Sequence, residues 1–469
     1  MQHRDKNGVL SATLQFFQTI KAKKKTQLRK IAIISLAILA MNIFKVDASF
    51  IGSTTVESVN SNGSIGNDDS VFPVISETGR YIAFESLANN LVPYDTNGKR
   101  DVFFRDRHEG ITKRISVHSN GTEANDDSGL PSISIDGRYV TFVSKANNLV
   151  DNDTNNKEDV FIHDTVNGTT IRILGVYDRQ PDGDSSYPKI SGNGNYVVFT
   201  SRANNLVVYD DNEGVDTFVY ERTSGHITLV SIDSSGNPAN GDSFGHAASS
   251  YDGQYISFTS WASNLISGDI NNHPDVFLKD MATGDISLVS IGPNGNRGND
   301  LSASPALSSD GKFVAFLSRS TNFQYENISE YKDIYLRDID AGTTIRLSES
   351  PSGIQSNGWS DFPRISADGR YVTFFSAASN LIDNDTNGYD DIFLYDSELG
   401  ALSCVSVNSV GGQGNMESHV ATISANGQYV AFHSHSTNFD GIDTNEKWDV
   451  YVHKNFEDMY KLFLPVIYK

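Results

Sequence analysis

Two short segments of this sequence carry oxygen-bearing side chains at the spacing of a cation-binding loop. Residues 383–391 read Asp-Asn-Asp-Thr-Asn-Gly-Tyr-Asp-Asp, and residues 151–159 read Asp-Asn-Asp-Thr-Asn-Asn-Lys-Glu-Asp. Calcium prefers several oxygen ligands at roughly 2.3–2.6 Å, and a tight turn bends the chain around the ion. Positions 1, 3, 5 and 9 of each segment therefore predict calcium ligands: Asp151, Asp153, Asn155 and Asp159, and Asp383, Asp385, Asn387 and Asp391.

A structural interpretation of the same aspartates stays open. An EF-hand loop also needs a glutamate at position 12, where this chain has Leu394 and Ile162, so the pattern is closer to the calcium loops of integrin-type propellers. Five related segments lack the leading aspartate but keep the ninth one. A constant ninth position beside a variable first position is typical of turn chemistry, in which the aspartate ties the loop to the following strand. The ninth positions are Asp101, Asp159, Asp216, Asp275, Asp333, Asp391 and Asp449.

The loops belong to a unit that recurs seven times. Its turn glycine returns every 57–59 residues, and a period of this size indicates a repeat architecture. Residues 358–415 contain four short segments rich in β-branched and aromatic residues, separated by turns, and no helical periodicity. Four antiparallel strands per repeat predict a propeller blade. The turn glycines are Gly79, Gly137, Gly194, Gly253, Gly311, Gly369 and Gly427.

We therefore predict an all-β fold, a seven-bladed β-propeller over residues 49–457, with blades starting near residues 67, 125, 183, 241, 300, 358 and 416. The seventh copy lacks a good fourth strand, and residues 54–60 are similar to the fourth-strand ends of other copies. This N-terminal strand is expected to complete blade 7, which closes the ring and removes an open sheet edge. Residues 458–469 form a hydrophobic C-terminal tail.

Several polar residues recur at one place in each copy and are predicted to hold the blades together. A serine follows the second strand, and an asparagine follows the serine by four residues. A polar residue kept in all seven copies is most simply an anchor for a loop. The two sets are Ser86, Ser144, Ser201, Ser260, Ser318, Ser376 and Ser434, and Asn90, Asn148, Asn205, Asn264, Asn322, Asn380 and Asn438.

The unit Ser366-Ala367-Asp368-Gly369-Arg370-Tyr371-Val372-Thr373-Phe374, followed by an Asp-led third strand, resembles the WD40-like (PD40-type) repeat of TolB-like β-propellers. The resemblance spans about residues 54–454. It implies a propeller that serves as a binding platform, as a partner in envelope complexes, or as a lid on a peptidase. We do not expect the N-terminal α/β domain of the typical TolB arrangement in this sequence, because the repeat takes up nearly all of it after residue 48.

The N-terminal residues and the charge balance predict export. Residues 1–48 combine a basic region with a 14-residue apolar run, Ile31 to Phe44, as a signal peptide does; an uncleaved N-terminal anchor is the alternative. The formal charge of −21 becomes −28 without this segment, and such a surface repels nucleic acid and anionic membranes. Cys404 is the sole cysteine, so no intrachain disulfide forms, and we expect it half-buried in a strand.

Catalytic motifs such as H-E-x-x-H and a Gly-rich phosphate loop are absent. His246 and His419 lie near first strands, with Asp242 and Glu417 close in sequence, and a pair across the channel could serve acid–base chemistry. The long loops between strands 2 and 3, and between blades, emerge on one face, which is the default functional surface.

We therefore expect a secreted, periplasmic or cell-surface monomer that binds a protein or carbohydrate on this face, without enzyme activity or nucleic acid. Contact with a membrane is expected only through an uncleaved N-terminal segment. The alternative is an extracellular hydrolase or lyase that acts on a polysaccharide or another polymer.

Overall fold

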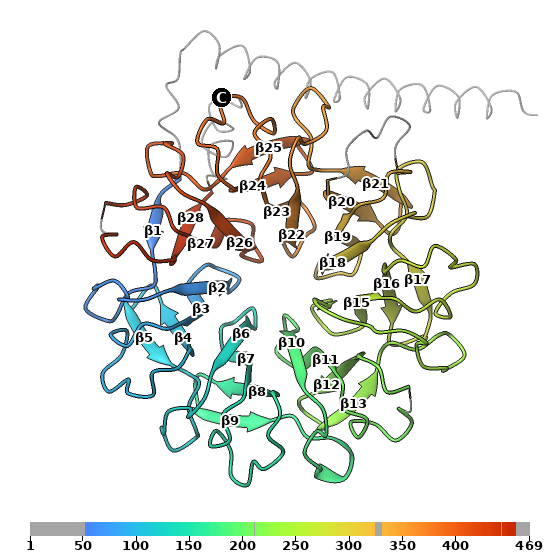
Figure 1. The fold of residues 1–469 in the computed structure, drawn as a ribbon, viewed down its shortest axis with the longest axis horizontal. Helices are drawn as coiled ribbons and strands as arrows, with labels where there is room; N and C mark the ends of the chain where they lie inside the picture. Colours follow the sequence, from blue (N-terminus) through green and yellow to red (C-terminus); the bar gives the residue numbers. More distant parts are fainter. Residues whose placement is uncertain (1–51, 211, 324–330, 442, 456–469) are drawn as a thin grey trace, which may run out of the picture. The chain divides into compact units, whose positions relative to one another are not determined.

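The structure, a computed structural model, describes residues 52–210, 212–323, 331–441 and 443–455. These residues form seven four-stranded antiparallel sheets arranged around a central channel (Figure 1). The predicted seven-bladed propeller is confirmed. The predicted N-terminal signal (1–48) and C-terminal tail (458–469) lie outside the described residues.

Each blade runs from an innermost strand at the channel to an outermost strand at the rim. Blades 1 to 4 consist of β2 (Ser70–Ile75), β3 (Tyr81–Ser86), β4 (Asp101–Asp106) and β5 (Ile111–Arg114); β6 (Ser128–Ile133), β7 (Tyr139–Ser144), β8 (Asp159–Asp164) and β9 (Thr169–Arg172); β10 (Ser185–Ile190), β11 (Tyr196–Ser201), β12 (Asp216–Glu221) and β13 (His226–Leu229); and β14 (Ala248–Ser249), β15 (Tyr255–Ser260), β16 (Asp275–Asp280) and β17 (Ile286–Leu288). Blades 5 to 7 consist of β18 (Ser302–Leu307), β19 (Phe313–Ser318), β20 (Asp333–Asp338) and β21 (Thr343–Arg346); β22 (Ser360–Ile365), β23 (Tyr371–Ser376), β24 (Asp391–Asp396) and β25 (Ala401–Cys404); and β26 (Ser418–Ile423), β27 (Tyr429–Ser434), β28 (Asp449–Lys454) and β1 (Thr54–Val56). A short 3₁₀ turn, η1 (Val176–Asp178), lies between blades 2 and 3.

The ring closes through the N-terminal strand, as predicted. β1 pairs antiparallel with β28, with Thr54 opposite His453 and Val56 opposite Tyr451. The strand is shorter than the predicted range 54–60, although Glu57 and Ser58 still form hydrogen bonds with Val450 and Asp449 of blade 7. Directly after β1, the buried Glu57 accepts hydrogen bonds from Arg105 Nε at 2.9 Å and Arg107 Nε at 2.8 Å, both in blade 1. The N-terminal strand therefore completes the sheet of blade 7, and the ion cluster that follows it links blade 7 to blade 1.

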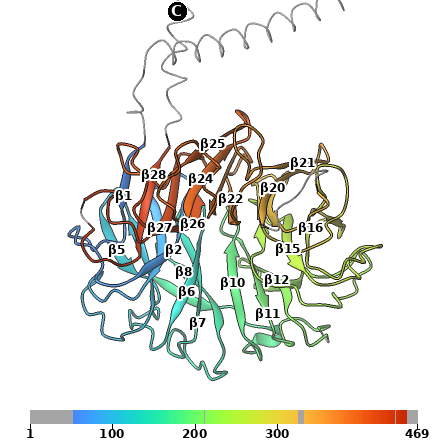
Figure 2. The same cartoon turned by 45° about the horizontal axis from the view of Figure 1, so that its top comes forward.

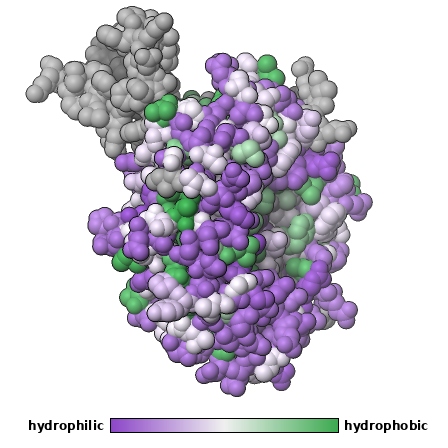
Figure 3. Space-filling model, turned by 60° about the vertical axis from the view of Figure 1, so that its left-hand side comes forward, coloured by the Kyte–Doolittle hydropathy of each residue, from purple (hydrophilic) through white to green (hydrophobic). Residues whose placement is uncertain are grey.

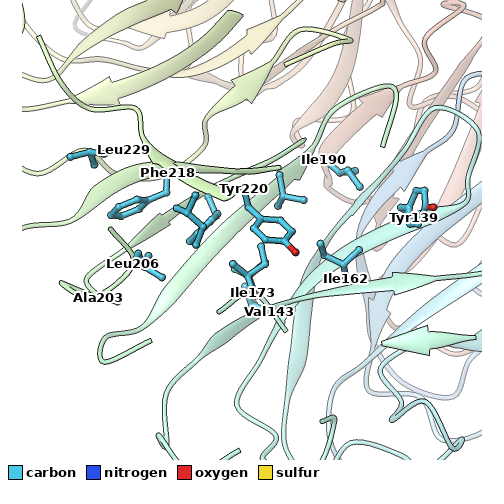
Figure 4. Close-up of a cluster of buried hydrophobic side chains, with 14 residues drawn as sticks. Tyr139, Val143, Ile162, Ile173, Ile190, Ala203, Leu206, Phe218, Tyr220 and Leu229 are labelled. Carbon is cyan, nitrogen blue, oxygen red and sulfur yellow. The ribbon is translucent and has the colours of Figure 1, made fainter. Parts of the chain in front are cut away.

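The core lies between neighbouring blades, because the sheets face one another around the ring. The second strands are buried on both faces, which explains their continuous apolar sequence: every residue of β7 is buried. Within a blade, paired aromatics stack, as Phe142 does on Phe161 at 5.6 Å. Between blades 2 and 3, Ile162 and Ile173 meet Tyr220 (Figure 4). Burial of this kind supplies most of the stabilisation of a fold that has no disulfide.

The turn glycines also contribute to contacts between blades. Gly311 has φ of +77°, and Cδ2 of Tyr255 in the preceding blade lies 2.4 Å from the place a Cβ atom would take. Only glycine fits both the backbone conformation and the approaching ring. In all seven blades the ring of a tyrosine or phenylalanine from the preceding blade lies against the turn glycine.

The repeated serine and asparagine are loop anchors, as predicted. In blade 6 the Oγ of Ser376 hydrogen-bonds the Oγ of Ser360 at 2.9 Å and accepts the backbone N–H of Ala378 at 3.1 Å. The Nδ2 of Asn380 donates to the backbone oxygen of Gln355 at 2.8 Å. These bonds join the loop after the second strand to the loop that enters the same blade.

The loops collect at the two ends of the strands (Figure 2). Tight turns join strands 1 to 2 and strands 3 to 4 at one end. The longer connections between strands 2 and 3, and between blades, lie at the other end, which we call the long-loop face. The exposed surface in Figure 3 is mostly hydrophilic, with small scattered apolar patches. Among the residues that the structure describes, no helix is long and apolar enough to cross a membrane.

Candidate functional site

In blade 2 an arginine lies between the predicted calcium ligands. Nη1 of Arg172, the last residue of β9, is 2.6 Å from Oδ1 of Asp153 and 3.0 Å from Oδ2 of Asp159, and all three side chains are buried. Asn155 donates its Nδ2 to Asp159 at 2.9 Å. The side chain of Asp151 is 92% exposed, and its Oδ1 lies 3.7 Å from Nε2 of His118. The loop thus brings together Asp153, Asn155 and Asp159 around a guanidinium group and leaves Asp151 outside.

In blade 6 the position of that arginine is taken by Cys404, which is half-buried in β25 as predicted. Asn387 Nδ2 donates to Asp391 Oδ2 at 2.9 Å, and Asp385 Oδ1 accepts a bond from Gln413 Nε2 at 3.3 Å. Burial, with Asp385 nearby, raises the pKa of Asp391 to about 6. Asp383 is exposed. This loop gathers Asp385, Asn387 and Asp391 without a basic residue among their bonded partners.

Both loops are closed by hydrogen bonds of their own. The Oδ1 of Asn387 accepts the backbone N–H of Tyr389 at 3.0 Å, and the Oδ1 of Asn155 accepts that of Lys157 at 3.1 Å. Within the described ranges, no group of three or more His, Cys, Asp or Glu side chains is placed to hold a metal ion. The geometry favours the structural interpretation of the ninth aspartate. Calcium binding stays a prediction, and blade 6 fits it better than blade 2, where Arg172 already neutralises the carboxylates.

The mouth of the channel on the long-loop face is built from a repeated bulge. Near the start of six innermost strands, one residue that is not glycine has a φ between 42° and 55°. A proline follows in five of them, and the register of the strand pair shifts there. Such bulges change the direction in which a side chain points, and in several blades they turn an apolar side chain toward the channel. The six residues are Phe72, Leu130, Tyr187, Ser304, Phe362 and Val420.

Beside this mouth, rings from blades 6, 7 and 1 form a chain of contacts that we call the aromatic–imidazole belt. Ring centroids are 5.0 Å apart for Trp359 and Phe375, for Phe375 and His419, and for His433 and Trp448. His419 and Trp448 are 5.3 Å apart. The belt comprises Trp359, Phe362, Phe375, His419, Trp448, His433, His435 and Phe72.

The belt lies on the long-loop face because of where its residues stand in the repeat. Phe72 and His419 are near the starts of innermost strands, Phe375 and His433 are near the ends of second strands, and Trp448 ends a long loop. Phe72 and Trp448 are 376 positions apart in the sequence, and only ring closure brings them near. Patterns in the sequence therefore could not indicate the belt.

Two ionisable pairs accompany the belt, and they differ from those expected. His419 Nε2 is 3.0 Å from Oδ2 of Asp390 in blade 6, whereas Glu417 is 4.0 Å from His435. The carboxylate partner of His419 therefore comes from the preceding blade and is not Glu417, its neighbour in sequence, whose carboxylate lies beside His435. Burial lowers the pKa of His433 to about 3, so this ring is neutral near pH 7.

His246 is also not paired with Asp242, its neighbour in sequence. His246 packs edge-to-face on Tyr187 at 5.0 Å and on Phe362 at 5.3 Å, and no carboxylate lines the mouth around it among the described residues. Asp242 instead accepts the backbone N–H of Val215 at 3.0 Å.

Comparisons with known proteins support the fold. No family model matches the sequence. Dipeptidyl-peptidase 5 of Porphyromonas endodontalis is 32% identical over 108 residues, which is 23% of this chain and 14% of that enzyme. The β-propeller domain of the Trilobed protease from Pyrococcus furiosus matches 83% of this chain and 96% of that domain, with a TM-score of 0.51 and 10% identity.

Oligogalacturonate lyase from Vibrio parahaemolyticus matches 87% of this chain and 96% of the lyase, with a TM-score of 0.50 and 11% identity. TolB from Acinetobacter baumannii is 15% identical with a TM-score of 0.40, over 72% of this chain and 63% of TolB. Sequence identities this low support a shared fold and no shared function. The chain has the seven-bladed β-propeller architecture that the repeat predicted, and the propeller domain of the protease and the lyase share the propeller fold.

Proposed function

We propose that this chain is a non-enzymatic binding propeller and that its ligand docks on the long-loop face at the aromatic–imidazole belt. The single observation that carries the proposal is the belt itself, an unbroken series of rings contributed by three blades. Trp359 is 37% exposed, and Trp448, His419 and His435 are partly exposed, so ring faces and polar edges are available together. Residues of this kind dominate the binding energy of many interfaces.

The ligand class that fits is a carbohydrate or a segment of protein. Flat, partly exposed rings offer stacking surfaces, and the nearby histidines and carboxylates offer hydrogen bonds. The strongly negative charge of the chain disfavours nucleic acid and anionic membranes as ligands. A monomer suffices for this mode of binding, because one ring supplies the whole belt.

Tryptophan fluorescence tests the proposal directly. The chain has three tryptophans, and Trp261 lies outside the belt on the same face, in the loop after β15. Titration of the mature protein with polysaccharides and with envelope extracts should yield a ligand that changes the emission. Trp359→Ala and Trp448→Ala should each weaken binding at least tenfold, and Trp261→Ala, the matched control, should not. Equal effects of all three substitutions would place the ligand elsewhere.

A second candidate is a hydrolase or lyase for an extracellular polymer. The His419–Asp390 pair at 3.0 Å beside the channel mouth is the observation that favours it, since such a pair can exchange protons with a substrate. Two propellers of similar fold belong to a protease and to an oligogalacturonate lyase. His419→Gln should abolish release of products from oligogalacturonate or another polymer. If the wild-type protein turns over no polymer, the hydrolase or lyase function is excluded and only the binding function remains.

We also propose a calcium ion in the loop at residues 383–391. The support is the absence of a basic partner at Asp385 and Asp391, in contrast to Arg172 in blade 2. Calcium should raise the melting temperature, and Asp385→Asn should remove most of that rise, whereas Asp153→Asn in blade 2 should not. A melting temperature that is the same with calcium and with chelator would exclude the ion.

Export to the periplasm, the cell surface or the medium is proposed from residues 1–48 alone. Mass spectrometry of the protein purified from an exporting host should find a mature N-terminus near residue 49. Full-length protein in the membrane fraction would instead support the uncleaved anchor.

A further inference from the structure

Beneath the mouth, the channel widens into a chamber of about 220 Å³ lined by the innermost strands. One layer of the chamber is formed by equivalent residues, two positions before the serine that directly follows each innermost strand. Five blades supply an uncharged residue there, such as Val74 or Thr422, and blades 3 and 6 supply Lys189 and Arg364. Blades 3 and 6 are three places apart in a ring of seven, so the two cations extend from nearly opposite walls into the same space.

These two cations lack the carboxylate partners that other enclosed arginines have. Arg114 pairs with Asp95 and Asp101 at 3.1 Å each, and Arg172 pairs with Asp153 as described above. By contrast, the described residues that line the chamber and the mouth include no aspartate or glutamate. In a chain of net charge −21, an enclosed space with only positive charge is unusual.

Asp361 is the acidic residue whose charge acts on Arg364, but its carboxylate is already paired with Nζ of Lys332 at 2.7 Å. The contact made by Arg364 itself is a bond from Nη1 to the backbone oxygen of Pro363 at 2.9 Å. Burial, together with the charge of Arg364, lowers the pKa of Lys189 to about 7. The two cations thus destabilise one another, and an anion between them would remove that cost.

His246 adds an uncharged polar group to the same space. It borders both the mouth and the chamber, and its Nδ1 is buried without a hydrogen-bond partner. Burial and the two nearby cations hold its pKa well below the usual range, so it contributes a neutral ring. An oxyanion or its protonated hydroxyl group could use this nitrogen, which is otherwise an unsatisfied group.

We propose that the chamber binds the oxyanion of a small ligand, a carboxylate or a phosphate, between Lys189 and Arg364. A guanidinium group binds such planar or tetrahedral oxyanions through two parallel N–H···O bonds, and an ammonium group adds a point charge. At the mouth the free space shrinks to about 20 Å³ between side chains that include Phe72, Tyr187 and Phe362. Phe72 and Phe362 of the belt narrow this mouth above the two cations, so we expect the anion to enter from the tight-turn side.

Calorimetric titration of the mature protein tests the site, with inorganic phosphate and glucuronate as probes and glucose as the neutral control. The wild type should bind at least one anion and not glucose. Lys189→Met and Arg364→Met should each weaken binding at least tenfold. Lys145→Met, which removes an exposed cation outside the chamber, should leave it unchanged. Binding of phosphate alone or of glucuronate alone would identify the preferred oxyanion.

Thermal unfolding without added anion provides an independent measurement. Lys189→Met should raise the melting temperature, because it removes the repulsion from Arg364. Lys189→Gln removes the same charge and should also raise the melting temperature, so it serves as a second variant if the methionine side chain packs poorly. Failure of both anions to bind the wild type at millimolar concentration, or equal weakening by Lys145→Met, would overturn the proposal. Neither result would bear on the belt, whose ligand is detected by tryptophan emission.

Discussion

The ion cluster at the ring closure offers a sharp test of how this propeller is held shut. Glu57 follows the closing strand of blade 7, and its two oxygens accept from Arg105 and Arg107 of blade 1 at 2.9 and 2.8 Å. Glu57→Gln keeps the shape of the side chain and removes its charge. Two guanidinium groups would then share a half-buried space without their counter-ion.

The expected loss follows from the burial of the three groups. Removing one partner of a buried ion pair costs about 3–5 kcal/mol. The side chain of Glu57 is 6% exposed, but those of Arg105 and Arg107 are 11% and 19% exposed and can recover part of their hydration. We therefore expect a loss near the lower limit, about 3 kcal/mol in the free energy of unfolding.

Urea unfolding, followed by circular dichroism, measures this loss. The matched control is Glu109→Gln, which removes an exposed carboxylate 3.8 Å from Arg80 in the same blade and should cost at most about 1 kcal/mol. If the two variants unfold at the same urea concentration, the cluster does not hold the closure. The closure would then depend on the pairing of β1 with β28 alone.

Two further predictions concern packing and pH. Gly311→Ala should lower the free energy of unfolding in urea by at least about 2 kcal/mol, because the Cβ atom would meet the ring of Tyr255. The control Gly225→Ala has a similar positive φ but open space around it, and it should cost only about 1 kcal/mol. Equal losses for the two variants would contradict the contact with Tyr255. Burial lowers the pKa of His163, which is hydrogen-bonded to Thr170 at 2.9 Å, to about 4. Its folded pKa is thus below the unfolded value of about 6.5, so its stabilisation is complete above pH 6.5 and is lost as the pH falls toward 4. His163→Gln should reduce this acid-induced loss by about 3 kcal/mol, measured as the difference in unfolding free energy between pH 7 and pH 4, and an unchanged pH profile would refute the assignment.

Much of the blade could be predicted because its determinants are local. Gly369 with its neighbours predicts a turn, and the apolar run after it predicts a strand buried on both faces. Ser376 and Asn380 act within one repeat, so their anchoring role could be read from their recurrence. The number of blades and the closure by residues near 54 follow from counting copies and finding the missing strand.

The partners of the predicted site residues were harder to foresee. Arg172 lies 13 positions after Asp159, and the register of the β8–β9 hairpin is what carries its guanidinium group between Asp153 and Asp159. Likewise, His419 pairs with Asp390 of the preceding blade and not with its sequence neighbour Glu417. Spacing along the chain states which residues are near one another in a loop, but not which side chain from another strand fills the space between them.

The amino-acid sequence by itself determined the repeat, the strands, the turns and the class of fold, because hydrophobic alternation and turn chemistry act over a few residues. Only the tertiary structure decided which side chains share a site. The belt exists because closure brings blade 7 beside blade 1, and Lys189 faces Arg364 because a ring of seven sets blades 3 and 6 on nearly opposite walls. Such proximity depends on how whole sheets pack, and no local pattern encodes it.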